Sequence, residues 1–148
     1  MDHLQMFYKI TKMLEEVRTG VLSSLDKNGK PHMRWLTPAI LKGRPGAIYA
    51  VSCPKFDWVQ SIYEKPCVEW MIQKPSLNEI MRIKGQMRIL DNPSLKAEIL
   101  QEIASRLVVF WKINTSSTDF VVLETVVEEA SHFLPMQGIQ TIVKFPVL

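Results

Sequence analysis

A row of basic side chains along one predicted strand is the most conspicuous group of charges in the sequence. Polar and apolar residues alternate over residues 79–90, so Arg82, Lys84 and Arg88 are expected to share one face of a strand. Three aligned cations could bind a polyanion such as a nucleic acid. Sites for single-stranded nucleic acids usually place aromatic side chains between the cations, and this strand has none. We therefore interpret the row as a solvated or dimer-rim face and predict no nucleic-acid site.

Residues that could bind a metal or act as nucleophiles are dispersed along the chain. His3, His32 and His132 are far apart in the sequence, so we predict no metal site. Cys53 and Cys67 have neither the spacing of a metal site nor that of a redox pair. We interpret them as reduced thiols of a cytoplasmic protein.

Paired carboxylates are another arrangement that supports acid–base chemistry. Glu128 and Glu129 are adjacent in a region where successive side chains of a strand point to opposite faces, so we expect them not to act together. No combination of Ser, His and Asp suggests a catalytic triad. The sequence therefore assigns no catalytic residue.

Length, composition and charge restrict the class of protein. A chain of 148 residues, 47% hydrophobic and 22% charged, is sufficient for one globular domain, which we expect to span residues 1–148. No apolar run approaches the ~18–20 residues that cross a membrane, and the N-terminus lacks the regions of a signal peptide. The formal charge of +3 is compatible with a phosphate ligand. We expect a cytoplasmic protein without a membrane span.

The elements that must position these side chains follow from hydrophobic periodicity. Sequential strands joined by turns, with few helices between them, favour an antiparallel barrel over a parallel sheet. We therefore predict an α+β fold, a small antiparallel β-barrel with flanking helices. The expected helices cover residues 2–18, 56–63 and 93 to about 105, and the expected strands cover 21–25, 32–41, 47–51, 67–72, 79–90 and 120–127, with weaker candidates at 132–134 and 139–145.

A predicted hairpin near the N-terminus carries a family resemblance. Asn28 and Gly29 tolerate positive φ, as the centre of a hairpin turn requires. The surrounding segment Leu22–Arg34 resembles the opening hairpin of the FMN-binding split-barrel proteins, the relatives of pyridoxamine 5′-phosphate oxidase, and in particular their general stress protein branch. The likeness extends over residues 14–133. Its further parts are Arg34 in the second strand, a strand ending at Ser52, a short helix over 58–62, Lys65 and Pro66, and a strand containing Gly85 that is followed by Asp91 and a helix.

This resemblance implies a split barrel that forms a homodimer and binds FMN between the two subunits. Backbone groups of the second strand would meet the flavin ring, and the segment between the third strand and the short helix would meet the phosphate. Cations, hydroxyls and the N–H groups of a helix start all bind phosphate well. The implied activity is that of an oxidoreductase acting on an unknown small electron donor or acceptor. The implied cofactor-binding residues are Arg34, Trp35, Leu36, Val51, Ser52, Lys55 and Trp58.

The sequence departs from the family pattern where the phosphate is expected. Asp57 and Trp58 stand where the family often carries a basic pair, and a carboxylate repels a phosphate. We predict that Arg34, Ser52 and Lys55 hold the phosphate instead. The arginine-bearing tail of the true oxidases has no counterpart in this sequence. We therefore do not expect pyridoxine 5′-phosphate to be the substrate.

Two other functions remain open at this stage. Asp57 and Trp58 suggest a flavin-free barrel with a structural or interaction role, and the basic row suggests a nucleic-acid-binding barrel. The absorption spectrum of the purified protein separates these possibilities, because bound flavin has visible bands. Salt-sensitive binding of an oligonucleotide would instead support the nucleic-acid reading.

Overall fold

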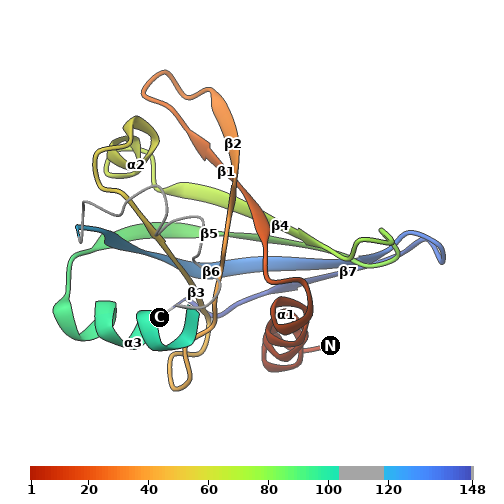
Figure 1. The fold of residues 1–148 in the computed structure, drawn as a ribbon. Coiled ribbons are helices and arrows are strands. Elements are labelled where there is room, and N and C mark those ends of the chain that lie inside the picture. Colours follow the sequence, from red (N-terminus) through yellow and green to blue (C-terminus); the bar gives the residue numbers. More distant parts are fainter. Residues whose placement is uncertain (104–118, 148) are drawn as a thin grey trace.

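The computed structural model describes residues 1–103 and 119–147, which contain three helices and seven strands (Figure 1). The expected α+β fold with an antiparallel sheet is confirmed. The predicted end of the third helix near residue 105 lies outside the described residues. The helices are α1 (His3–Val17), α2 (Asp57–Ile62) and α3 (Pro93–Ile103); the strands are β1 (Gly20–Leu25), β2 (Pro31–Leu36), β3 (Ala47–Ser52), β4 (Cys67–Gln73), β5 (Ile80–Leu90), β6 (Val121–Leu134) and β7 (Ile139–Lys144).

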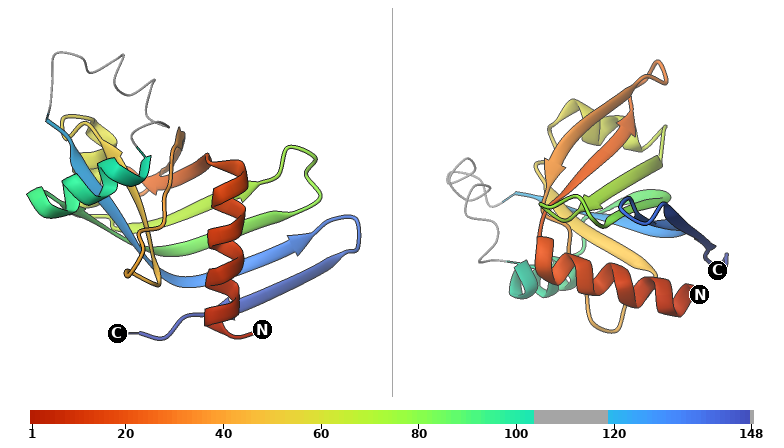
Figure 2. Two further views of the ribbon diagram at one scale, coloured as in Figure 1. Left: turned by 60° about the horizontal axis from the view of Figure 1, so that its bottom comes forward. Right: turned by 90° about the vertical axis from the view of Figure 1, so that its right-hand side faces the viewer.

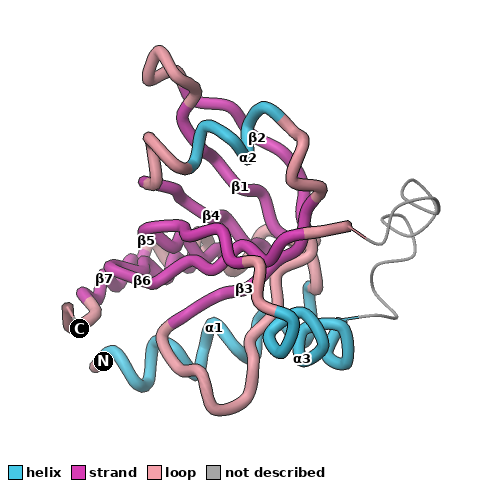
Figure 3. The backbone as a smooth tube through the Cα atoms, turned by 90° about the vertical axis from the view of Figure 1, so that its left-hand side faces the viewer, coloured by secondary structure: helices cyan, strands magenta, loops and turns pink. Residues whose placement is uncertain are grey.

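The strands form one antiparallel sheet in the order β2-β1-β4-β5-β6-β3, and β7 also pairs with β6. A bridge between Ala39 and Tyr49 ties the segment after β2 to β3, at the other end of this order. The sheet therefore curls into a partly closed barrel (Figure 3). The prediction that the second strand reaches residue 41 is wrong. It ends at Leu36, because Pro38 has no N–H to donate and the chain crosses there from β1 towards β3.

α1 is an amphipathic helix that runs across the strands of the barrel and packs against β4 and β7 (Figure 2). A capping box starts it: the Asp2 carboxylate accepts a hydrogen bond from the Gln5 N–H at 2.8 Å, and the Gln5 side chain accepts one from the Asp2 N–H at 2.9 Å. The apolar face of α1 joins the core inside the barrel. This inner core includes Met6, Ile10, Met13, Leu14, Leu22, Trp70, Ile83, Met87, Leu123 and Val127.

α3 lies on the outer face of β3 and β6 and builds a second, smaller core. Asn92 caps the start of this helix, because its side chain accepts a hydrogen bond from the Leu95 N–H at 3.0 Å. Side chains of β3 alternate between the two cores, which explains why all six residues of this strand are buried. The outer core consists of Ala39, Leu41, Ala47, Tyr49, Val51, Leu95, Ile99, Phe120 and Val122.

β6 is one continuous strand with a β-bulge, and the predicted break between strands at 120–127 and 132–134 is wrong. The register of β6 against β5 shifts between Lys84 and Gly85, which leaves Glu128 as the extra residue. Before the bulge β6 pairs with β3, and after it β6 pairs with β7. The extra residue interrupts the alternation of apolar side chains, which is why the pattern suggested two strands.

The bulge also brings two carboxylates to one side of the sheet. Gln86 donates a hydrogen bond to Glu128 at 3.0 Å, and the Lys84 ammonium lies 3.5 Å from the Glu129 carboxylate. Gln86 and Lys84 share the outward face of β5. The expectation that Glu128 and Glu129 point to opposite faces is therefore wrong.

Gly85 permits the close approach of β5 to the bulged strand. A Cβ atom at this position would lie 2.2 Å from the Val126 carbonyl oxygen and 2.9 Å from a methyl carbon of Thr125.

We expect Gly85→Ala to lower the free energy of unfolding by at least about 3 kcal/mol, the upper end of the cost of overpacking. Urea unfolding measures this change. Gly43→Ala is the control. Gly43 has φ +85 but open space around it, so this substitution should cost only the backbone strain of a left-handed residue, about 1–2 kcal/mol. Equal losses for the two variants would contradict the steric argument.

Candidate functional site

The β1–β2 hairpin and α2 lie side by side (Figures 1 and 3). Their side chains line an open pocket of about 660 Å³. This volume lies within the range of ordinary small-molecule sites. Charged, hydroxyl and aromatic side chains meet in it, which suits a ligand with both a polar group and a ring. The pocket is lined by Asp26, His32, Met33, Arg34, Phe56, Asp57, Trp58 and Ser61.

Arg34 is the central cation of this hairpin pocket. Its Nη1 donates hydrogen bonds to the Ser24 hydroxyl at 2.7 Å and to the Leu22 carbonyl at 3.3 Å. The guanidinium lies over the Trp58 ring, 4.3 Å from the centroid, in a cation–π contact. Burial lowers the pKa of Arg34, but an arginine remains charged at physiological pH. The contact with Trp58 holds this charge in a fixed position.

The register of the hairpin determines which side chains enter the pocket. Ser24 pairs with His32 and Leu22 pairs with Arg34, so His32 and Arg34 share the face of β2 that lies next to α2. Gly29 has φ +77 in the turn, and Asp26 exchanges backbone hydrogen bonds with the residues that close it. The sequence analysis missed His32 and Asp26 as site residues. Side chains two residues apart on a strand share a face, so the position of His32 two residues before Arg34 could have identified it.

His32 and Asp26 form a pair at the edge of the pocket. The Nε2 atom of His32 lies 2.8 Å from the Asp26 Oδ2 atom. The other carboxylate oxygen accepts hydrogen bonds from the N–H groups of Asn28 and Lys30, each at 2.9 Å. The bond from Lys30 and then that from His32 lower the pKa of Asp26. The carboxylate is therefore ionised and held in place by three donors.

The other predicted site residues lie elsewhere. Trp35 is on the opposite face of β2 from Arg34 and is 67% exposed, while Leu36 packs against the inner core. Val51 belongs to the outer core, and the buried Ser52 hydroxyl donates to the Cys53 carbonyl at 3.3 Å. Lys55 is exposed and does not line the hairpin pocket. Of the seven predicted residues, the pocket brings together Arg34 and Trp58.

The start of α2 contributes little to anion binding. The helix has six residues, its N-cap residue Phe56 makes no side-chain capping bond, and Asp57 places a negative charge in the first turn. That charge opposes a phosphate at the position where N–H groups would otherwise attract one. Any phosphate in the hairpin pocket therefore depends on side-chain cations.

The basic row on β5 is neutralised by carboxylates from the neighbouring strands. Glu124, which is 7% exposed, accepts hydrogen bonds from Arg88 Nε at 3.0 Å and from the Tyr49 hydroxyl at 2.7 Å. Burial and this hydrogen bond raise the pKa of Tyr49. The absence of a nucleic-acid site stays a prediction, and the pairing of the cations supports it. The ion pairs are Arg82–Glu69, Lys84–Glu129 and Arg88–Glu124.

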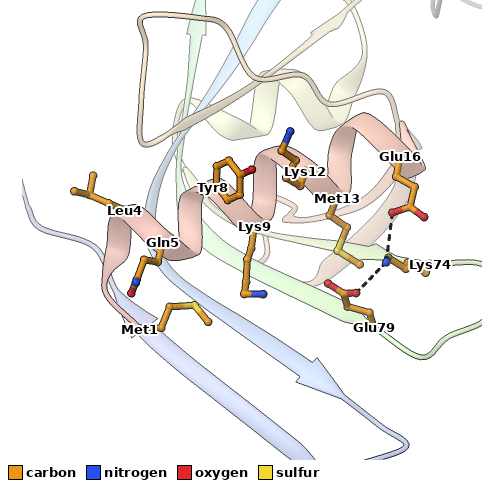
Figure 4. Close-up of a pocket in the computed structure, with 10 residues that line it drawn as sticks. All are labelled: Met1, Leu4, Gln5, Tyr8, Lys9, Lys12, Met13, Glu16, Lys74 and Glu79. Atoms are coloured by element: carbon orange, nitrogen blue, oxygen red, sulfur yellow. Dashed lines mark ion pairs between the residues drawn. The ribbon is translucent and has the colours of Figure 1, made fainter.

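A second groove of about 760 Å³ runs along α1 (Figure 4). Lys74 lies between two carboxylates there, 3.4 Å from Glu16 and 3.1 Å from Glu79, and His132 bonds to Glu79 at 3.0 Å. Burial raises the pKa of Glu79, but the bonds from His132 and Lys74 outweigh it and lower the pKa. These charges bind one another and tie α1 to the loop between β4 and β5. Lys9 and Lys12 also line this groove, and none of the seven predicted cofactor-binding residues does.

Two further observations concern the part of the chain that the structure describes. No three or more His, Cys, Asp and Glu side chains there come together as metal ligands. None of its helices has the length and apolar character needed to span a membrane.

Comparison with known proteins gives a family and a fold. The family model of pyridoxamine 5′-phosphate oxidase matches residues 7–133. No curated protein sequence matches the chain. A solved structure from Clostridium acetobutylicum, of a protein related to general stress protein 26, aligns with a TM-score of 0.74 over 95% of both chains at 10% identity.

Two other solved structures carry different ligand names. A pyridoxamine 5′-phosphate oxidase-related, FMN-binding protein from Nostoc punctiforme aligns with a TM-score of 0.66 and 12% identity, over 95% of this chain and 96% of its own. The heme storage protein HutZ from Vibrio cholerae also aligns with a TM-score of 0.66 and 12% identity, over 86% of this chain and 92% of its own. At these identities the alignments establish the split-barrel fold alone. Since the family model covers most of its length, the chain belongs to the pyridoxamine 5′-phosphate oxidase family.

Proposed function

We propose that this chain binds FMN between two copies of itself and acts as an oxidoreductase on a small electron donor or acceptor. The observation that carries the proposal is Arg34 in the hairpin pocket. Both of its hydrogen bonds come from Nη1, and among the described residues Nε and Nη2 have no hydrogen-bond acceptor. A half-buried guanidinium with free donors above an aromatic ring suits the phosphate of a flavin nucleotide.

β2 suits the flavin ring because it is an edge strand. Among the described strands it stands at the end of the order, with β1 as its one neighbour. The backbone groups along its other edge are available to a ligand. This agrees with the interpretation, drawn from the family resemblance, that backbone groups of Arg34, Trp35 and Leu36 meet the ring.

The outer face of β2, β1 and β4 supports the homodimer. Trp35, Val21 and Met71 are aligned across these three strands by their register. Trp35 is 67% exposed, Met33 is 73% exposed and Met71 is 36% exposed. Contiguous exposed apolar side chains mark protein interfaces. A second copy packed on this face would border β2, so one strand would serve both the dimer and the ligand.

The flavin would supply hydride or electron transfer when bound, and the residues of this chain would bind and orient it. Arg34 would hold the phosphate, and Trp58 would keep the guanidinium in place. Asp57 weakens this arrangement because its carboxylate lines the same pocket.

Replacing Arg34 tests the phosphate assignment. We expect Arg34→Gln to weaken FMN binding by about one to two orders of magnitude, because a charge-assisted hydrogen bond contributes about 1.5–3 kcal/mol. Riboflavin, which lacks the phosphate, should lose much less. Fluorescence titration of the apoprotein with each flavin measures both affinities. Lys55→Gln is the matched control, since Lys55 lies outside the hairpin pocket, and should change FMN affinity little.

Removing the negative charge of Asp57 is an independent test of the phosphate assignment. Asp57→Asn should strengthen FMN binding and leave riboflavin binding unchanged, because it removes one repulsive charge. If Arg34→Gln binds FMN like the parent protein, the phosphate lies elsewhere. If the parent binds neither flavin, the proposed function is wrong, and titration with hemin then tests the other ligand named among the structural relatives.

Replacing Trp35 tests the dimer. We expect the parent to sediment as a dimer at micromolar concentration, and Trp35→Asp to shift it towards the monomer because a charge would be buried at the interface. FMN affinity should fall in parallel, since binding and association are linked. Met136→Asp is the control on a side chain that is 87% exposed in the β6–β7 turn. A monomeric parent that still binds flavin would refute the intersubunit site.

A further inference from the structure

We propose that His32 is a second cation, beside Arg34, that binds the FMN phosphate in the hairpin pocket. We further propose that it takes up a proton from solution when the phosphate binds. The inference rests on the proposed function and adds a ligand that the family resemblance did not supply. FMN binding at this site is thereby coupled to protonation. Three features of the hairpin pocket lead to it.

The first feature is position. His32 and Arg34 are two residues apart on the same face of β2, and both line the hairpin pocket. The His32 side chain is 57% exposed, so a proton can reach the ring from solvent. A ligand held by the free donors of Arg34 therefore has an imidazole next to it.

The second feature is the orientation of the ring. Asp26 is an ionised acceptor held by the backbone N–H groups of Asn28 and Lys30, so the Nε2 atom of His32 must donate to it. The remaining ring nitrogen, Nδ1, has no hydrogen-bond partner among the described residues. In a neutral imidazole with Nε2 protonated, Nδ1 is an acceptor and cannot donate to a phosphate oxygen. It becomes a donor only when the ring gains a second proton.

The third feature is the charge of the pocket. The charged groups that line it with His32 are Asp26 from the hairpin turn, Arg34 from β2 and Asp57 from α2. With a neutral imidazole, the two carboxylates outnumber the single guanidinium. A proton on His32 makes the pair with Asp26 neutral overall and leaves Arg34 to balance Asp57. The approach of a phosphate dianion favours that protonated state.

The number of protons bound with the ligand tests this inference directly. Calorimetric titration of the parent with FMN at about pH 7.5, in two buffers of different ionisation enthalpy, should show net proton uptake of up to one per site, because Nδ1 can donate to the phosphate only after the ring gains a second proton. Riboflavin should show none. His32→Gln should abolish the uptake and weaken FMN on the order of tenfold at about pH 6.5, with a smaller loss at higher pH.

Two variants complete the design. Asp26→Asn should reduce the uptake while leaving Arg34 in place, because the acceptor that orients the ring becomes an amide. His3→Gln removes a histidine of α1, outside the hairpin pocket, and should keep the uptake of the parent. FMN binding that depends on Arg34 but proceeds without proton uptake, or with equal uptake in His32→Gln, would overturn the role of His32 and leave the proposed function intact. A parent that binds no FMN would overturn both.

Discussion

The contact between Gly85 and the Val126 carbonyl is the constraint on which the rest of the structure depends. It lets β5 and β6 approach more closely than any side chain would allow, directly beside the bulge at Glu128. Bulges bend and twist a strand, and here β6 changes its partner from β3 to β7 across the bulge. One strand thereby serves the closed part of the barrel and an open extension. β2 lies at the end of the strand order, where Arg34 contacts Trp58 of α2.

The position of β2 allows one short strand to have both of the roles proposed for it. Its two faces carry different side chains, Arg34 and His32 next to α2, and Trp35 and Met33 towards solvent. A strand in the middle of a sheet would have its backbone groups paired on both sides, whereas this edge strand keeps one side open. Ligand binding and association of two chains are therefore expected to depend on the same six residues. A substitution on one face of β2 that shifts the backbone would also move the side chains on the other face.

The sequence predicted the parts of this fold that depend on local pattern. The period of α1, the Asn-Gly turn and the alternation along β5 each have a local cause, and the corresponding elements are confirmed. Two strand boundaries were predicted wrongly. At Glu128 one extra residue shifts the alternation of side chains, and after Leu36 the chain leaves β1 and pairs with β3. In the site, Arg34 and Trp58 meet as neighbours, but Ser52 and Lys55 do not join them. Their placement depends on the direction in which the chain leaves β3, and no local spacing encodes that direction.

The family therefore determines the architecture, and under the proposed function individual side chains of the hairpin pocket determine the ligand. An FMN-binding protein and a heme storage protein align equally well with this chain, so the barrel itself does not choose between them. Selectivity between FMN and heme must therefore come from the few charged side chains that contact the ligand. Here a single guanidinium shares the pocket with Asp26 and Asp57, and the Trp58 ring lies against that guanidinium. Under the proposed function, a phosphate in this pocket would depend on the one guanidinium of Arg34 and on the charges of the groups beside it.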